Sequence, residues 1–357
     1  MDATALSDQG AALLEQGRLA EAARLLHLAL QLAPDDALLH YRLGLFASDS
    51  GNAGAALAAF DASIRLDHAN PRAHNNRGSA LLLLGRREDA AAAFREAMRL
   101  DAGLSQPLLN LGHLLESQAR PGEAAALYRD AIARGLDVDV FAHHLAAVEG
   151  DTPARASDSW VRVTFDNFAP TFETQVLEQL GYQAPQRLAG SILAHIAGPL
   201  RILDLGCGTG LCGAALAHRK GNLTGVDLSQ KMLALAGARG IYDELHCQEV
   251  HHFLAGTSGQ PWNAIVAADV FIYIGALESI FAGVARVLAP GGVFAFSTEE
   301  SKERDYALSP TGRYAQSLAY VRRLAQGDFL ILEAAPAIIR KEGDAALAGR
   351  LYLLQKR

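Results

Sequence analysis

Residues 202–210 read Ile-Leu-Asp-Leu-Gly-Cys-Gly-Thr-Gly, and this stretch decides the fold of the region around it. Its apolar start is typical of a buried strand, and a turn of small residues follows. Because Gly206, Gly208 and Gly210 lack a Cβ atom, the backbone can adopt φ > 0 there and a ligand can approach closely. The helix predicted over 211–219 presents free N–H groups at the same place. We therefore expect a ligand-binding crevice at the end of this strand.

Asp227 ends the next predicted strand, within the sequence Gly-Val-Asp-Leu-Ser. A carboxylate at this position can accept hydrogen bonds from the ribose hydroxyls of a nucleoside, as it does in NAD sites. The glycine spacing distinguishes an NAD site from a site for a nucleoside that lacks phosphate. Here it is G-x-G-x-G, whereas the G-x-G-x-x-G of dinucleotide sites fits a pyrophosphate against a helix. The spacing favours a nucleoside without phosphate over NAD.

The segments D-L-G-C-G-T-G, at 204–210, and G-V-D-L-S-x-x-M-L, at 225–233, resemble the first two motifs of class I S-adenosylmethionine-dependent methyltransferases. The resemblance spans most of the chain beyond residue 155. It implies a Rossmann-like α/β fold with a seven-stranded sheet whose last strand is antiparallel. It also implies S-adenosylmethionine as the methyl donor and S-adenosylhomocysteine as the product.

Short β runs alternate with helical stretches in this part of the chain, which predicts a parallel sheet covered on both faces. The predicted strands are Arg201–Gly206, Leu223–Asp227, Leu245–Val250, Ala264–Val270, Gly292–Ser297, Phe329–Ile339 and Ala346–Gln355. Their number agrees with the sheet that the resemblance implies. We therefore predict a methyltransferase domain over residues 160–357.

The resemblance further implies which residues contact the cofactor. Leu228 is expected to lie against the adenine, and Met232 to cover its edge. Glu249 is expected to accept a hydrogen bond from the adenine amine, with Gln248 as the alternative. The full set is Asp204, Gly206, Cys207, Gly208, Gly210, Asp227, Leu228, Met232, Glu249, Asp269 and Phe165.

Two residues of that set are expected to lie near the end of the cofactor that carries the methyl group. Asp269 is expected to face the methionyl part of the cofactor, and a helix cap is the alternative interpretation. Phe165 opens the segment 165–172, Phe-Asp-Asn-Phe-Ala-Pro-Thr-Phe. This segment resembles an aromatic helix that folds over the cofactor, where aromatic faces are favourable neighbours of the sulfonium cation. Packing in the core is the alternative for these phenylalanines.

Methyl transfer from a sulfonium needs a positioned acceptor and exclusion of water more than it needs an acid or a base. A base is required only when the acceptor must lose a proton. Asp269 and Tyr273 are the catalytic candidates near the strand ends, and His251 and His252 are further ones. The sequence does not choose among them.

The segment 299–316, between the fifth and sixth predicted strands, is long and polar. A-A-D-V-x-x-Y-I-G, at 267–275, and G-R-Y-A-x-S, at 312–317, resemble bacterial predicted methyltransferases that carry N-terminal tetratricopeptide repeats. In that family, insertions at this place form the acceptor pocket. The resemblance makes Arg313, Tyr314 and Gln316 candidate substrate contacts.

The first part of the chain is an internal repeat. Gly10, Gly44, Gly78 and Gly112 are spaced 34 residues apart, and three further series keep the same step. These series are Gly17, Gly51 and Gly85; Ala22, Ala56, Ala90 and Ala124; and Leu26, Phe60, Phe94 and Tyr128. Small residues facing a larger apolar residue let two antiparallel helices pack closely. The pattern resembles the tetratricopeptide repeat, and predicts a domain of about four repeats plus a capping helix over 1–148, followed by a linker over 149–159.

Composition narrows the class of protein. Residues 1–150 contain 13 Arg and 19 Asp or Glu, a net charge of −6, and the remainder has a net charge of −1. Neither part shows the basic excess of a nucleic-acid binder. The three cysteines do not have the spacing of a disulfide framework or a zinc site, and no signal peptide or membrane span is recognisable. We expect a cytoplasmic protein without a metal.

Three functions are compatible with these features. The first is a methyltransferase whose repeats recruit a protein partner or substrate on their concave surface. The second is a small-molecule methyltransferase whose repeats serve assembly. The third is an adaptor with a non-catalytic methyltransferase-like domain, which the intact glycines and Asp227 disfavour. The acceptor, the partner and the oligomeric state are not indicated by the sequence.

Overall fold

The computed structural model describes residues 2–169, 172–173, 176, 181–302, 304–309, 311–342 and 345–357. It divides into two compact units, Met1–Glu149 and Gly150–Arg357. Pro170 and Thr171 of the predicted aromatic helix, and Pro310 of the predicted insertion, lie outside the described residues. Within the described ranges, no helix is both long enough and apolar enough to cross a bilayer.

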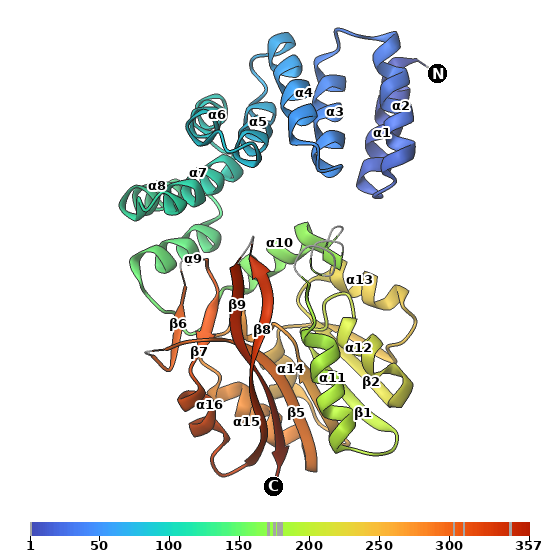
Figure 1. The fold of residues 1–357 in the computed structure, drawn as a ribbon, viewed down its shortest axis with the longest axis vertical. Helices are drawn as coiled ribbons and strands as arrows, with labels where there is room; N and C mark the ends of the chain where they lie inside the picture. Colours follow the sequence, from blue (N-terminus) through green and yellow to red (C-terminus); the bar gives the residue numbers. More distant parts are fainter. Residues whose placement is uncertain are drawn as a thin grey trace. The chain divides into compact units, whose positions relative to one another are not determined.

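The first unit is a series of antiparallel helix pairs followed by one further helix (Figure 1). Its helices are α1 (Ala3–Glu15), α2 (Leu19–Leu32), α3 (Ala37–Asp49), α4 (Ala53–Leu66), α5 (Pro71–Leu83), α6 (Arg87–Leu100), α7 (Ser105–Ser117), α8 (Pro121–Ala133) and α9 (Val138–Glu149). This confirms the all-α repeat architecture expected from the sequence. Asp36 and Asn70 cap α3 and α5 by accepting hydrogen bonds from backbone N–H groups of the first turn, which satisfies donors that a helix start leaves unpaired.

The 34-residue period has a steric cause inside each helix pair. Phe60 and Phe94 are fully buried, and each ring lies against the glycine of the preceding helix. A Cβ atom on Gly44 would lie 2.4 Å from the Phe60 ring, and one on Gly78 would lie 2.5 Å from the Phe94 ring. Gly112 stands in the same relation to Tyr128. The helices can therefore approach only where glycine faces the aromatic residue.

The second unit contains a mixed sheet of nine strands among the described residues. The strands are β1 (Leu200–Leu205), β2 (Lys220–Asp227), β3 (Glu244–Cys247), β4 (Trp262–Ala267), β5 (Leu288–Glu300), β6 (Tyr306–Leu308), β7 (Tyr314–Gln316), β8 (Phe329–Glu342) and β9 (Ala345–Lys356). Strands β3, β2, β1, β4 and β5 are parallel neighbours in that order. Strand β9 pairs antiparallel with β5 and with β8, so the predicted antiparallel last strand is confirmed.

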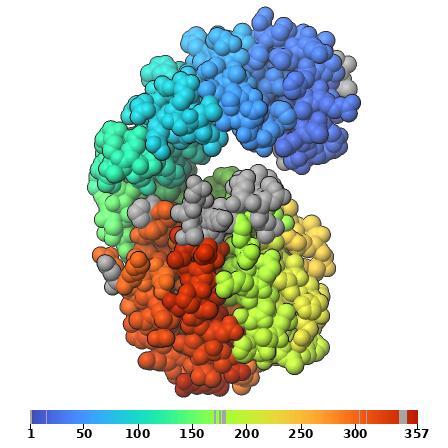
Figure 2. Space-filling view, viewed as in Figure 1, coloured from blue at the N-terminus to red at the C-terminus, as the bar shows by residue number. Residues whose placement is uncertain are grey.

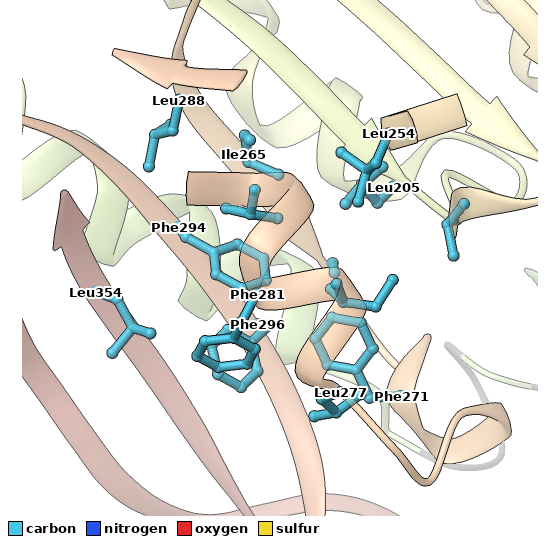
Figure 3. Close-up of a cluster of buried hydrophobic side chains, with 14 of the residues drawn as sticks. Leu205, Leu254, Ile265, Phe271, Leu277, Phe281, Leu288, Phe294, Phe296 and Leu354 are labelled. Atoms are coloured by element: carbon cyan, nitrogen blue, oxygen red, sulfur yellow. The ribbon is translucent and has the colours of Figure 1, made fainter. Parts of the chain in front are cut away.

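Helices cover both faces of this sheet. The remaining helices are α10 (Asp158–Phe168), α11 (Ala184–His195), α12 (Leu211–Leu216), α13 (Gln230–Ala238), α14 (Val250–Gly256), α15 (Glu278–Val287) and α16 (Leu318–Ala325), with the short 3₁₀ turns η3 (Ala217–Arg219) and η4 (Phe271–Tyr273). One apolar cluster joins the sheet to α14, α15 and α16, and it includes the side chains of Figure 3. A second cluster joins it to α11 and α12; α11 and the β8–β9 hairpin lie side by side at the surface (Figure 2).

The predicted strands differ from the observed ones at both edges of the sheet; for example, β2 begins at Lys220 and not at Leu223. The strand predicted over Leu245–Val250 ends at Cys247, and Val250 begins α14. The strand predicted to reach Val270 ends at Ala267. Strands β6 and β7 lie within the segment that we predicted to be an insertion; they pair with each other, and β7 also pairs with β5. Backbone turns and caps, which have no apolar period, decide these boundaries.

Three histidines lie together at the end of the repeat unit. The rings of His113, on α7, and His144, on α9, have centroids 4.8 Å apart, and His143 is also buried. His143 and His144 therefore belong to the packed interior of the repeat unit and not to its surface. Burial lowers the pKa of His113, and burial together with the neighbouring histidines lowers that of His144 to about 3.

We expect Gly78→Ala to destabilise the repeat unit by about 1–3 kcal/mol, the usual cost of overpacking, because the new methyl group would overlap the Phe94 ring. The matched control is Gly122→Ala, also in a helix, where no described atom lies within 4 Å of the added carbon. There alanine should stabilise by about 0.4–1 kcal/mol. Urea unfolding followed by circular dichroism measures both, and equal shifts in the same direction would contradict the steric explanation.

The buried histidines should make the stability of the repeat unit fall with decreasing pH. The folded-state pKa of His144, about 3, lies below the ordinary value of about 6.5. Between these values the unfolded chain binds the proton more strongly, so the free energy of unfolding decreases by up to about 1.4 kcal/mol per pH unit. His144→Phe should flatten this dependence in unfolding experiments between pH 7 and pH 4. A profile with the same slope in the variant would refute the assignment.

Candidate functional site

The three glycines of the loop after β1 all have left-handed backbone, with φ of 62° at Gly206, 54° at Gly208 and 91° at Gly210. Their surroundings differ. A Cβ atom on Gly206 would lie 2.5 Å from Cγ2 of Val270, and one on Gly210 would lie 2.9 Å from the ring of Tyr242. At Gly208 no described atom lies within 4 Å of that position. We expected all three glycines to allow close approach of a ligand. Only at Gly208 is the space in which a side chain would lie unoccupied.

Asp227, at the end of β2, lies directly beside this opening. Its Oδ2 accepts a hydrogen bond from the Gly208 N–H at 2.9 Å, and its Oδ1 accepts one from the Ser229 N–H at 2.8 Å. Burial raises the pKa of the Asp227 carboxyl, while the hydrogen bonds from backbone N–H groups oppose that rise. Among the described residues, no cation forms an ion pair with it. The carboxylate is therefore fixed by backbone donors and has not been neutralised by a lysine or an arginine.

Asp204 has a different role from the one expected. Its buried Oδ2 accepts hydrogen bonds from the Tyr242 hydroxyl at 2.7 Å and from the Gly213 N–H at 3.1 Å. Burial raises the pKa of this carboxyl to about 7, with the two hydrogen bonds acting in the opposite direction. The carboxyl group lies beneath the loop and joins it to the start of α12 and to Tyr242.

A cavity of about 330 Å³ opens at this edge of the sheet. Nine of the predicted site residues line it: Gly206, Gly208, Asp227, Leu228, Glu249, Asp269, Tyr273, Arg313 and Phe165. Six others do not belong to the described lining: Asp204, Cys207, Gly210, Met232, Tyr314 and Gln316. Met232, Tyr314 and Gln316 are completely buried. The cavity therefore unites residues from the ends of β2, β4 and the loop after β1, as expected for a sheet of this type.

Glu249 lies at the cavity but has several partners within the protein. It caps α14, because its Oε2 accepts a hydrogen bond from the His252 N–H at 3.0 Å. Its Oε1 lies 2.6 Å from Nδ1 of His251 and 3.6 Å from Nη1 of Arg155. Burial would raise the pKa of Glu249, but the His251 hydrogen bond, the backbone donor and Arg155 lower it overall. His251 and His252, which contact Glu249, are outside the described lining of the cavity.

Asp269 has the unusual backbone of the site. Its φ is 55°, a value that non-glycine residues adopt rarely. The buried Ser297 hydroxyl accepts a hydrogen bond from the Asp269 N–H at 2.8 Å and donates one to Asp269 Oδ1 at 2.9 Å. The carboxylate lies at the end of β4, across β1 from Asp227.

An aromatic cluster forms one wall of the cavity. The rings of Phe165 and Trp160, both on α10, lie 5.2 Å and 5.7 Å from the ring of Tyr273 between centroids. Asp166, also on α10, accepts a hydrogen bond from the Ser229 hydroxyl at 2.6 Å. Helix α10 is thereby attached to the loop that follows Asp227, and its Phe165 and Phe168 line the cavity.

Sequence reasoning missed the strand-like segment before α10, which we had predicted to be a linker. The Ala156 N–H donates to the Tyr273 carbonyl, and the N–H groups of Gly275 and Ala276 donate to the Ala154 carbonyl. Arg155 and Ala156 line the cavity. The short polar sequence carries no period that could have revealed this pairing.

The predicted substrate contacts separate into two groups. Arg313 lines the cavity. Gln316 lies behind the wall, where its Nε2 donates hydrogen bonds to the carbonyl oxygens of Phe271 and Ile274 at 2.9 Å and 2.8 Å. It therefore fixes the turn η4 that carries Tyr273. Tyr314 is buried at the same β6–β7 hairpin.

Comparison with known proteins agrees with this architecture. A family model described as "Methyltransferase domain" matches residues 202–292, and models described as "Tetratricopeptide repeat" match residues 13–78 and 71–103. The chain is 29% identical over 119 residues to a ubiquinone biosynthesis O-methyltransferase of Dechloromonas aromatica (strain RCB), covering 31% of this chain and 50% of that protein. It is 33% identical over 106 residues to the putative methyltransferase YqeM of Bacillus subtilis (strain 168), covering 28% and 43%. The chain spans about half the length of the curated relatives it matches.

Solved structures similar to each unit have low TM-scores. Magnesium protoporphyrin IX methyltransferase (ChlM) from Synechocystis PCC 6803, with bound SAM, has 18% identity and a TM-score of 0.42, covering 58% of this chain and all of that one. The first TPR of Spaghetti (RPAP3), bound to an HSP90 peptide, has 18% identity and a TM-score of 0.32, covering 33% and 94%.

We expect Gly208→Asn to weaken binding of S-adenosylhomocysteine strongly while leaving the fold intact. Asparagine tolerates left-handed backbone, and its Cβ atom would meet no described atom within 4 Å at this cavity-lining position. Gly240→Asn is the control, because Gly240 has φ of 64° and similar open space outside the cavity. Calorimetry should show loss of at least about tenfold in affinity only at position 208. Equal binding by the two variants would show that the ligand lies elsewhere.

Proposed function

We propose that this chain, which combines a methyltransferase domain with tetratricopeptide repeats, transfers a methyl group from S-adenosylmethionine to an acceptor in the cavity of its second unit. The observation that carries the proposal is the Asp227 carboxylate, fixed by the Gly208 and Ser229 N–H groups beside a glycine whose side-chain position is open. The remaining lone pairs of a carboxylate can accept hydrogen bonds from two ribose hydroxyls.

The residues present fit the nucleoside part of that cofactor. Gly208 offers close backbone approach, and Leu228 lines the cavity beyond Asp227 as an apolar neighbour for a base. Both oxygens of Glu249 already have partners, so its carboxylate would accept from an adenine amine as an additional interaction. Gln248 also lines the cavity and is the alternative acceptor.

The opposite end of the cavity fits a cation. Phe165 and Tyr273 present aromatic rings there, and aromatic faces attract cations such as a sulfonium. Asp269 contributes a carboxylate at the same end, suited to the ammonium of an amino acid. When bound, S-adenosylmethionine supplies a methyl group on a sulfonium that is already reactive toward nucleophiles. The wall formed by α10 excludes water, and the site positions the acceptor for in-line attack.

Proton removal from the acceptor has two candidate residues: Tyr273 in the arrangement above, and Asp269 if its carboxylate does not bind the ammonium. Both line the cavity at the end of β4 and in the turn after it. Arg313 also lines the cavity, and a guanidinium suits an acceptor with a negative or carbonyl oxygen. The aromatic wall also favours a flat apolar acceptor, and the names of relatives that are O-methyltransferases agree with an oxygen nucleophile.

We further propose that the repeats bind a protein partner, which is either the substrate or an assembly component. A polar ladder supports this role. Arg42 donates hydrogen bonds to Ser7 and Asp8 of the preceding repeat, and the amide groups of Asn76 and Asn110 donate to Tyr41 and Asn75. These links join the first helices of successive repeats into one stiff polar face, which suits a peptide main chain.

The three cysteines are free, in agreement with the reducing cytoplasm that we propose as the location of this protein.

Asp227→Ala should weaken binding of S-adenosylhomocysteine by roughly tenfold to a hundredfold, the scale of hydrogen bonds lost to a charged group. The matched control is Asp243→Ala, because that carboxylate also accepts a backbone hydrogen bond at 2.7 Å, from the Leu223 N–H, but lies outside the cavity lining. Isothermal calorimetry measures both. Unchanged affinity in the Asp227 variant would remove the basis of the proposed activity.

Transfer of a labelled methyl group in a lysate tests recruitment by the repeats. The full chain should label a discrete acceptor, and a chain of residues 151–357 should label it less while binding S-adenosylhomocysteine equally well. Equal labelling by both chains would show that the repeats do not deliver the acceptor. Labelling of small molecules by both would favour the second candidate, a small-molecule methyltransferase.

A further inference from the structure

The backbone of Asp269 is held in a conformation that few residues adopt. Ala119, Asp137 and Asp269 are the non-glycine residues with positive φ among those described, and the first two lie in turns of the repeat unit. Asp269 alone of these lines a cavity. Strained backbone persists only where its surroundings fix it, and it occurs often at functional sites.

Ser297 supplies that fixation from the neighbouring strand. It lies in β5, is fully buried, and pairs through its backbone with Leu351 of β9. Its hydroxyl oxygen accepts from the Asp269 N–H, and its proton goes to Asp269 Oδ1. A hydroxyl can do both at once. The two bonds fix the backbone and the carboxylate of the same residue relative to each other.

The turn that results connects to the glycine loop. Ala268 and Val270, on either side of Asp269, both line the cavity. Cγ2 of Val270 occupies the space where Gly206 would carry a Cβ atom. Packing of Val270 against Gly206 therefore supports the glycine-loop side of the turn, whereas the Ser297 hydroxyl holds the Asp269 carboxylate.

We infer that Ser297 is a positioning residue, which holds the Asp269 carboxylate at the end of the cavity that takes the amino-acid part of the methyl donor. The inference rests on the proposed function. Asp227 belongs to β2 and Asp269 follows β4, with β1 between the two strands. The two carboxylates therefore contact opposite ends of one elongated ligand, the ribose at Asp227 and the ammonium at Asp269.

Two ligands distinguish positioning from general damage. S-adenosylhomocysteine contains the amino-acid part, and 5′-methylthioadenosine contains the same nucleoside without it. We expect Ser297→Ala and the nearly isosteric Ser297→Cys to bind S-adenosylhomocysteine about tenfold more weakly, on the scale of a lost hydrogen bond to a charged group. Affinity for 5′-methylthioadenosine should stay within about twofold of the wild type. Ser297→Thr, which keeps the hydroxyl, should retain both affinities.

Ser191→Ala is the matched control, because the Ser191 hydroxyl also donates to a carboxylate, Glu333, at 2.7 Å, and lies outside the cavity lining. This variant should bind both ligands as the wild type does. In an Asp269→Ala background, Ser297→Ala should cause no further loss for S-adenosylhomocysteine, since the group that it positions is absent.

Calorimetry on the full chain distinguishes failure of the positioning role from failure of the proposed function. Equal weakening of both ligands by Ser297→Ala, or an undiminished loss in the Asp269→Ala background, would overturn the positioning role. Unchanged affinity for S-adenosylhomocysteine in both Ser297→Ala and Ser297→Cys would overturn it as well. If the wild type binds neither ligand, the proposed function itself fails, and this result differs from all the others.

Discussion

The hydrogen bond from the Gly208 N–H to the Asp227 carboxylate is the interaction on which the site depends. A carboxylate at a buried strand end needs donors, and left-handed backbone at Gly208 directs one toward it. The bond joins the loop after β1 to the end of β2 while leaving the space over Gly208 open. The other parts surround this point: Val270 and Tyr242 pack against the neighbouring glycines, and α10 covers the cavity.

The features that could be predicted from the sequence are those set by residues at local or regular spacings along the chain. The glycine turn after β1 and the acid after β2 follow from the local needs of a strand, a tight turn and a ribose. The repeat unit was predicted because one steric relation, such as Gly78 against Phe94, recurs every 34 residues. In both cases the residue type at one position is dictated by a neighbour whose spacing along the chain is regular.

The parts that were not predicted depend on contacts without such regularity. We predicted Gln316 as a substrate contact, but its amide reaches two carbonyl groups more than 40 residues earlier in the chain. Ser297 has the sequence context of an ordinary strand residue, although its hydroxyl fixes Asp269. Glu249 falls within the strand predicted over Leu245–Val250, whereas its side chain caps a helix. Tertiary partners, which a single sequence does not display, decide each of these roles.

The proposed activity requires that Asp227 hold the sugar of a sulfonium nucleoside beside Gly208. A crystal structure of the chain with S-adenosylhomocysteine tests this requirement most directly. We predict that both ribose hydroxyls lie within hydrogen-bond distance of the Asp227 oxygens, with the ligand passing over Gly208 and its amino-acid end at Asp269. A ligand bound at another place, or one whose ribose makes no contact with Asp227, would contradict this assignment.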